Sequence, residues 1–150
     1  ERTRQVMEAM SDIVWSVNPH NDTMENVLQR MKEFAVEILE SQGIALHFEV
    51  DEVVKFLNLP MEKRKDFYLL FKEAINNAAK YSGASNVWVT VRTDNNGLHL
   101  EVRDNGRGFD PALVKRGNGL WNMQRRAEKI GGQFVVESAV GEGTRVEVRV

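Results

Sequence analysis

Three polar residues recur at helical spacing inside a mostly apolar segment of the chain. Glu73, Asn77 and Lys80 lie four and three residues apart, so they project from one side of a helix. A carboxylate, an amide oxygen and an ammonium group in one row suit magnesium and phosphate, because Mg²⁺ prefers oxygen ligands and lysine can contact a phosphate oxygen. The same spacing also fits a solvated helix face. The triplet therefore predicts a magnesium-nucleotide site only if other segments support it.

Three glycine-containing segments could provide that support. Residues 104–108 read Asp-Asn-Gly-Arg-Gly; the glycines let the backbone approach a ligand, and the aspartate can accept a hydrogen bond from an exocyclic amine. Residues 117–120 read Gly-Asn-Gly-Leu and precede a predicted helix, whose first N–H groups favour anions such as phosphates. Residues 141–144 read Gly-Glu-Gly-Thr, which is typical of a hairpin turn. Taken singly, the first two segments also fit an ordinary turn and a flexible loop before a helix cap.

Apolar residues at helical spacing predict three helices in the first half of the chain. The first spans residues 6–17 and ends before a proline, because the residue preceding proline is disfavoured in a helix. The second has Asp22 and Glu25 as a predicted cap pair and ends at Gly43. The third runs from Pro60 to Tyr81 and is expected to be long and well buried.

Alternating apolar residues predict strands in the rest of the chain. Asn96-Gly97 joins two of them as a hairpin turn that needs positive φ, and a second hairpin turns at residues 141–143. A further helix covers residues 120–130. The predicted strands are residues 44–50, 87–91, 98–102, 134–136 and 146–150. Helices interleaved with hairpins predict an α+β sandwich, a mixed and mostly antiparallel sheet with helices on one face.

Composition narrows the function classes further. With 150 residues the chain is long enough for one globular domain. The net charge of −2 gives no basic field for nucleic acid or an anionic membrane, so any phosphate binding must be local. The chain has no cysteine, which excludes disulfides and thiolate zinc sites. The absence of cysteine also fits a reducing compartment, so we expect a cytoplasmic domain. No apolar run approaches the roughly 20 residues of a membrane helix, and a longer parent protein could still carry an anchor.

Together, these segments resemble the nucleotide-binding boxes of the GHKL ATPases, in the form used by sensor histidine kinases of the nitrate-sensor and desaturase-sensor type. Residues 71–82 are similar to the N box, 102–109 to the G1 box, 117–120 to the G2 box and 141–144 to the terminal glycine box. The resemblance covers about residues 46–150. It implies the Bergerat α/β sandwich, with ATP lying between the N-box helix and a lid over residues 110–118.

The resemblance also implies roles for individual residues at the adenine end. Asp104 is expected to hold the adenine amino group, with Gly106 and Gly108 beside it. Thr144 and Leu120 are expected to contribute to the same pocket.

At the phosphate end, Asn77 is expected to bind the Mg²⁺ that bridges the phosphates, and Lys80 to contact phosphate. Gly117 and Gly119 are expected to let the lid close, and Glu73 stands where the family has an acidic residue that orients or deprotonates the attacking group. Lys115 and Arg116 of the lid could add positive charge, although a solvated loop is the favoured explanation.

The implied reaction transfers the γ-phosphoryl group of ATP to a histidine and then to an aspartate of a response regulator, mainly by positioning and charge neutralisation. His20 follows a proline and does not match the phosphoacceptor pattern. Residues 1–18 are similar to the end of a second dimerisation helix, and residues 19–150 to the catalytic domain. We therefore expect a piece of a longer kinase whose phosphoacceptor and dimerisation domain lies elsewhere, itself a monomer or weak dimer.

Four residues depart from the family pattern or invite another interpretation. Tyr81 stands where many relatives have histidine, and Trp121 follows the G2 box where smaller residues are common. We expect Trp121 to anchor the following helix in the core. His47 and His99 alternate with apolar positions and are expected to be surface histidines.

Two other functions remain open at this stage. A degenerate module that binds a nucleotide and acts through partner contacts is disfavoured by the intact Glu73, Asn77 and Asp104. A serine kinase of the anti-sigma-factor type shares the fold but lacks a dimerisation helix such as the one predicted before residue 18. ATPases related to gyrase, Hsp90 or MutL have larger domains and longer lids.

Overall fold

The computed structural model describes residues 23–94, 97–110 and 120–150. Its helices are α2 (Met24–Glu40), the short 3-10 helix η2 (Glu52–Phe56), α3 (Met61–Tyr81) and α4 (Leu120–Lys129). Its strands are β1 (Ala45–Val50), β2 (Asn86–Asp94), β3 (Gly97–Asp104), β4 (Gln133–Ser138) and β5 (Thr144–Arg149). The α+β class and the predicted order of elements are confirmed over these residues.

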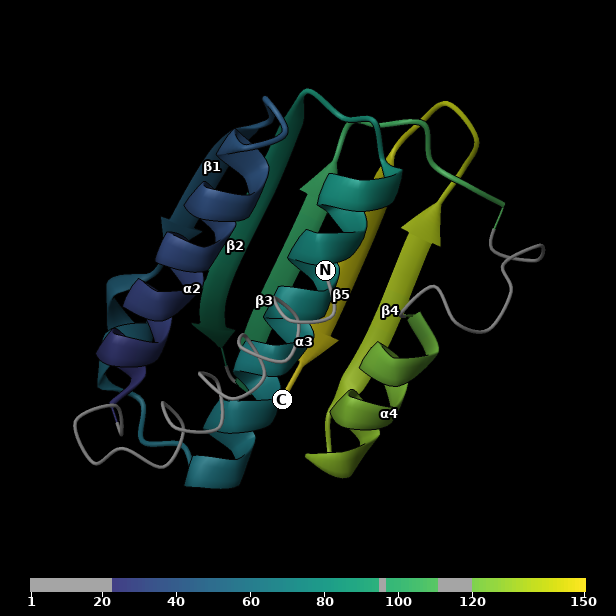
Figure 1. Cartoon of the computed structure of the whole chain (residues 1–150). Helices are drawn as coiled ribbons and strands as arrows, with labels where there is room; N and C mark the ends of the chain where they lie inside the picture. Colours follow the sequence, from purple (N-terminus) through teal and green to yellow (C-terminus); the bar gives the residue numbers. More distant parts are fainter. Residues whose placement is uncertain (1–22, 95–96, 111–119) are drawn as a thin grey trace, which may run out of the picture.

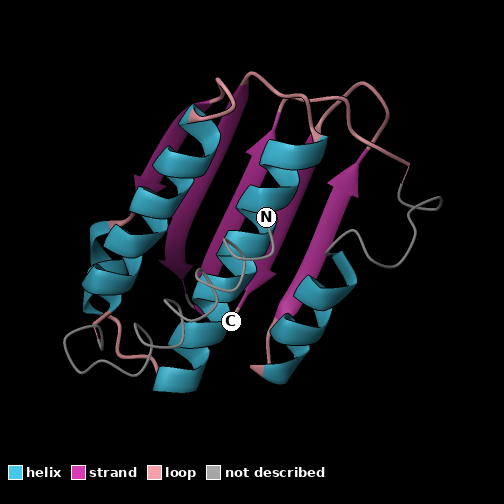
Figure 2. Cartoon of the chain, in the orientation of Figure 1, coloured by secondary structure: helices cyan, strands magenta, loops and turns pink. Residues whose placement is uncertain are grey.

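The five strands form one mixed sheet in the order β1-β2-β3-β5-β4. Only β1 and β2 pair in parallel, with Phe48 opposite Val89, and the other neighbours are antiparallel. The parallel pair requires a long crossover, which α3 provides. All three α-helices lie on the same side of the sheet, with α3 over its centre, α2 over the β1 side and α4 beside β4 (Figures 1 and 2).

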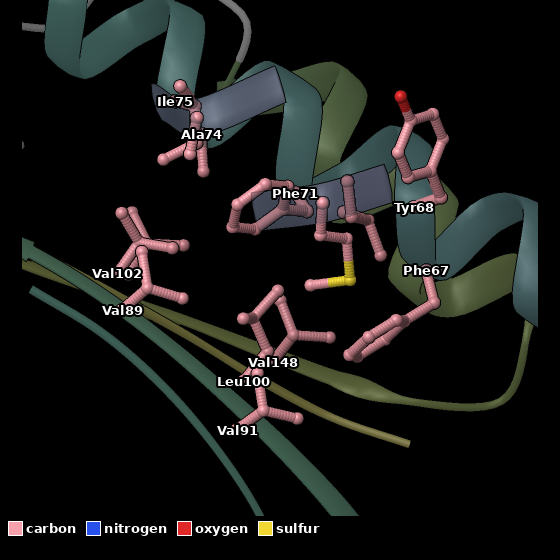
Figure 3. Packing of buried hydrophobic residues seen from close by; sticks show 14 of the residues in the cluster. Phe67, Tyr68, Phe71, Ala74, Ile75, Val89, Val91, Leu100, Val102 and Val148 are labelled. Atoms are coloured by element: carbon pink, nitrogen blue, oxygen red, sulfur yellow. The ribbon is translucent and has the colours of Figure 1, made fainter. Parts of the chain in front are cut away.

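The core lies between the sheet and the three helices α2, α3 and α4. Along β2, Val87, Val89 and Val91 are buried while the intervening residues are less so, the alternation expected of a half-covered sheet. Phe67 and Phe71 of α3 point toward the valines and leucines of the sheet (Figure 3). Burying each such aromatic side chain contributes about 1.5–3 kcal/mol. This packing fixes how α3 is rotated, and so which of its polar residues lie next to the ends of the strands.

The first residues of the helices show where the sequence patterns did not suffice to predict the caps. Thr23 caps α2, with its Oγ1 accepting the N–H of Asn26 at 3.2 Å. The prediction of Asp22 and Glu25 as the cap pair is therefore wrong; Glu25 lies in the first turn instead. Pro60 is the N-cap of α3 rather than its first residue. The predicted helix over residues 6–17 lies outside the described residues, and η2 was not predicted.

None of the described helices covers the opposite face of the sheet (Figure 1), and charged side chains of β3, β4 and β5 pair on it. Arg145 of β5 pairs with Glu101 at 2.9 Å, with Glu137 at 3.3 Å and also with Glu147. We call these four residues the Arg145 ladder. His99 on this face is only 3% exposed, with its Nε2 atom 2.9 Å from Asp94 Oδ1, so the prediction of a surface histidine is wrong for His99 and right for the exposed His47.

Among the described residues, no helix is both long and apolar enough to cross a membrane.

Candidate functional site

A cavity of about 300 Å³ lies between the C-terminal half of α3, the ends of β3 and β5, and the start of α4. Ala74 and Ala78 face it from α3, and their small side chains leave the space that larger residues would fill. The cavity is lined by Ala74, Asn77, Ala78, Tyr81, Ser82, Val102, Asp104, Arg107, Gly108, Phe109, Leu120, Met123, Thr144 and Val146. Mostly apolar walls with a few convergent polar groups are typical of a small-molecule site.

Asp104 is the charged group at the sheet end of this cavity. It is the last residue of β3 and only 8% exposed. Its Oδ1 accepts the N–H of Gly106 at 2.8 Å. Burial raises the pKa of Asp104 above its ordinary value of 3.8, while backbone hydrogen bonds from Gly106 and Thr144 partly offset that effect. A buried carboxylate held in this way can accept a hydrogen bond from a ligand.

The loop after Asp104 is shaped by glycines, because a larger residue at these positions would force the neighbouring backbone to move. Gly108 has φ of +63°, and a Cβ on it would lie 2.0 Å from the carbonyl oxygen of Ala139. The next residue, Phe109, donates its N–H to Ser138 Oγ at 2.9 Å. Ser138 Oγ also lies 2.8 Å from Thr144 Oγ1. These contacts fix the backbone of Phe109 and the hydroxyl of Thr144, and both residues line the cavity.

The helix α4 forms the wall that follows residues 111–119 in the chain. Leu120 and Met123 line the cavity, and α4 is tied to α3 by two ion pairs. Arg126 and Lys129 contact the two oxygens of Asp66 at 3.0 and 3.3 Å, and Asp66 is only 1% exposed. We call these three residues the Asp66 clamp. It sets the position of α4 against α3, and thereby the position of this wall.

The polar stripe of α3 is divided between the cavity and its surroundings. Asn77 lines the cavity, whereas Glu73 is half-buried outside its lining and Lys80 is exposed. Among the described residues, no three His, Asp or Glu side chains gather in a metal-binding group. A cation beside Asn77 would therefore need further oxygen ligands from a bound molecule, as Mg²⁺ commonly takes from phosphates.

The structure thus brings five of the ten predicted site residues together around one cavity. Asn77, Asp104, Gly108, Leu120 and Thr144 line it, and Gly106 lies in the loop behind Asp104. Gly117, Gly119, Lys115 and Arg116 lie outside the described residues. Roles for all of these side chains stay predictions.

Sequence reasoning missed the apolar wall of the cavity. Phe109, Met123 and Val146 line it, but each reads as an ordinary core residue in the sequence. Trp121 was wrongly predicted as a core anchor, because its side chain is 45% exposed and the Arg125 guanidinium lies 4.8 Å from its ring centre. The signals available were that Phe109 ends the segment similar to the G1 box and that Met123 lies three residues after the segment similar to the G2 box.

A wider hollow of about 410 Å³ lies on the charged face of the sheet, beside Trp88, Arg103 and Glu142. The indole of Trp88 is covered by His47 stacked on it at 5.3 Å and by the Arg103 guanidinium at 4.6 Å. With the ring occupied by these neighbours, this hollow presents no aromatic surface comparable to the cavity beside Asp104.

Comparisons with known proteins give a consistent result. A profile of the family described as "Histidine kinase-, DNA gyrase B-, and HSP90-like ATPase" matches residues 62–150. Sensor histidine kinase YdfH of Bacillus subtilis is 34% identical over 128 residues, and the match covers 81% of this chain and 30% of that protein. Sensor histidine kinase LiaS of the same organism is 32% identical over 121 residues, 80% of this chain and 34% of LiaS. The chain thus spans about a third of the length of these relatives.

Among solved structures, the catalytic domain of histidine kinase ThkA has the same fold, with a TM-score of 0.68 and 15% identity. The match covers 85% of this chain and 92% of that one.

Proposed function

This chain belongs to the family of histidine kinase-, DNA gyrase B- and HSP90-like ATPases, and we propose that it is the ATP-binding catalytic domain of a sensor histidine kinase. The observation that carries this proposal is the shared cavity of Asp104 and Asn77, one at the end of the sheet and the other on α3. A buried carboxylate suits an amino group of a base, and an amide oxygen suits a magnesium-phosphate group. Adenine and phosphates at these two places give ATP a defined direction in the cavity.

At the adenine end, Asp104 accepts a hydrogen bond from the exocyclic amino group of the base. Its carboxylate already accepts backbone N–H groups of Gly106 and Thr144, so it is oriented before the ligand arrives. Leu120, Met123 and Val146 supply apolar surface for the flat base. Gly106 and Gly108 keep the loop short and close to the pocket.

At the phosphate end, Asn77 is the residue that fits a magnesium ion, because it lines the cavity and its side chain carries an amide oxygen. When bound, Mg²⁺ neutralises charge on the β- and γ-phosphates of ATP. Lys80 is exposed one turn further along α3, where its flexible ammonium can reach a phosphate oxygen. Gly117 and Gly119 would let the preceding segment fold over the phosphates.

The proposed reaction is an in-line transfer. A ring nitrogen of a histidine attacks the γ-phosphorus while the bond from that phosphorus to the β–γ bridging oxygen breaks, so that ADP leaves with both electrons of that bond. Glu73 lies one turn before Asn77 on α3 and orients the attacking imidazole or accepts its proton. The phosphohistidine then passes its phosphoryl group to an aspartate of a response regulator.

The phosphoacceptor histidine belongs to a dimerisation domain of the parent kinase, which residues 1–18 would join to the catalytic domain at residues 19–150. A serine kinase or a purely regulatory nucleotide-binding module uses the same cavity. Phosphoryl transfer to histidine, which the assay below measures, distinguishes a histidine kinase from the serine kinase and from the regulatory module.

We expect Asn77→Ala to abolish the magnesium dependence of ATP binding. The variant loses the amide oxygen but keeps Asp104 and the apolar wall, so ATP should still bind, roughly tenfold more weakly in the presence of Mg²⁺. The measurement is calorimetric titration of ATP with Mg²⁺ and with EDTA. Asn76→Ala is the matched control, because Asn76 is the neighbouring asparagine of α3 and does not line the cavity.

The same proteins are then mixed with the dimerisation domain of a parent kinase and γ-labelled ATP. Acid-labile label on that domain is expected with wild type and Asn76→Ala, and not with Asn77→Ala. Magnesium-dependent binding that persists in Asn77→Ala would remove Asn77 from the metal site. Failure of the wild-type chain to bind ATP at all would contradict the proposed function.

A further inference from the structure

The side chain of Asn105, next to Asp104, joins two segments that are far apart in the sequence. Its Oδ1 accepts the N–H of Ser85 at 3.0 Å and the N–H of Asn86 at 2.9 Å. Its Nδ2 donates to Ser85 Oγ at 2.9 Å. One amide group thus binds the turn that follows α3 with three hydrogen bonds, across about twenty positions of the chain.

The backbone of the same loop is seated directly against the end of α3. The N–H of Arg107 donates to the carbonyl oxygen of Ser82, the C-cap of the helix, at 2.8 Å. A Cβ on Gly106 would lie 2.1 Å from that same oxygen, so the loop is as close as a glycine permits. Ser82 Oγ in turn accepts the N–H of Ala84 at 3.0 Å, which fixes the turn that Asn105 holds.

These contacts connect the two walls of the cavity at one end. Asp104 and Gly108 lie on the loop side, and Ala78 and Ser82 lie on the helix side. The cavity-lining part of the loop begins one residue before Asn105, so a shift of Asn105 moves Asp104 relative to α3. The width of the cavity at Asp104 therefore depends on how firmly this loop is attached to the turn.

We propose that Asn105 is a positioning residue of the nucleotide site, which sets the distance between the Asp104 loop and the end of α3 and thereby the affinity for the base. The inference rests on the proposed function for the identity of the ligand. Asn105 acts through the two backbone N–H groups that its Oδ1 accepts. Its own side chain does not line the cavity, so it changes where Asp104 lies and leaves the phosphate end of the site unaltered.

The experiment compares wild type with Asn105→Ala and Asn105→Asp. In the alanine variant ATP and ADP are expected to bind roughly tenfold more weakly, with the magnesium dependence kept, because the loop is released at the base end only. In the transfer assay KM for ATP should rise by the same factor while kcat stays within about twofold. The aspartate variant should bind ATP as wild type does, since a carboxylate oxygen still accepts both N–H groups.

Asn86→Ala is the matched control. It removes a neighbouring amide that donates to Ser85 Oγ at 3.0 Å and contacts His47 at 2.9 Å, but it keeps the Asn86 N–H that Asn105 accepts. Its ATP affinity should stay within about twofold of wild type. If Asn105→Ala does not fold, Asn105→Gln carries the same amide one methylene further out and should lower ATP affinity in a folded protein.

Hydrogen exchange of the nucleotide-free protein separates this inference from the proposed function. The amides of Ser85 and Asn86 should exchange faster in Asn105→Ala than in wild type, whether or not the wild type binds ATP. Wild-type KM in a folded Asn105→Ala protein would overturn the inference. So would an aspartate variant as weak as the alanine variant, or unchanged exchange at these two amides.

Discussion

Replacing Asp104 with asparagine is expected to abolish ATP binding without destabilising the domain. The carboxylate accepts N–H groups from Gly106 and Thr144, and the proposed adenine amino group is one more donor. An asparagine amide has only one oxygen. When that oxygen accepts the backbone N–H groups, its NH₂ group faces the amino group of the base, so that two donors meet. We expect the ATP affinity to fall at least about a hundredfold, as when a buried polar group is left unpaired. Calorimetric titration in the presence of Mg²⁺ measures it.

The stability of the same variant follows from the raised pKa of Asp104. Because the folded state binds this proton more strongly than the unfolded state does, the contribution of Asp104 to stability falls as pH rises from the ordinary pKa of 3.8 through the raised folded value. Above that window the ionised group remains a cost, which asparagine removes. Thermal unfolding at pH 7 should therefore show a Tm for Asp104→Asn equal to or above wild type.

Asp51→Asn serves as the control for both measurements, because it makes the same change at an exposed aspartate outside the cavity. A clearly lower Tm for Asp104→Asn would show that the carboxylate stabilises the fold. ATP affinity within tenfold of wild type would mean that the base is held elsewhere.

The second large effect is a loss of stability expected at the Asp66 clamp, where the carboxylate is buried and its two cationic partners are exposed. Asp66 is 1% exposed, whereas the side chains of Arg126 and Lys129 are 40% and 63% exposed. Removing both cations by Arg126→Gln and Lys129→Gln leaves a buried carboxylate unpaired, which costs about 3–5 kcal/mol. Asp66→Asn should cost less, about 1–2 kcal/mol, because the freed cations can turn into water. Denaturant unfolding of the three proteins measures the difference.

A triple variant tests this explanation. Asp66→Asn added to the two glutamine substitutions removes the unpaired charge and should restore part of the lost stability, although it takes away one more group. Lys32→Gln with Lys65→Gln changes the net charge equally at exposed positions and should leave stability nearly unchanged. If the double cation variant is no less stable than Asp66→Asn, the clamp contributes little to holding α4.

The fold was largely predictable because its signals are periodic and local. The alternation at residues 87–91 and 98–102 and the apolar stripe of α3 identified a sheet covered by a helix, and Gly97 has the expected positive φ of 110°. Helix caps were less predictable, because Asp22 and Thr23 are both good N-cap residues, and the free energy of the helix differs little whichever of them is the cap. The short η2 helix has no periodic pattern long enough to detect.

The site was predictable only in part, for a different reason. Residues such as Asp104 and Asn77 stand out because polar groups in strand ends and buried helices are unusual. Phe109 and Val146 do not stand out, since apolar residues are expected near any core and their common cavity depends on how β3, β5 and α4 meet. The hydrogen bonds of Asn105 were hidden likewise, because asparagine before glycine is ordinary turn chemistry.

The Arg145 ladder restricts how this domain can evolve. One guanidinium pairs with Glu101, Glu137 and Glu147 on three neighbouring strands. Losing it would remove a cation from three carboxylates at once, of which Glu147 still pairs with Arg149, whereas losing any one glutamate leaves the other two pairs in place. Changes are therefore tolerated in one order, with a glutamate lost before the arginine. Among descendants of this sequence, Arg145 should be replaced only where at least one of the three glutamates has already been replaced by a neutral residue.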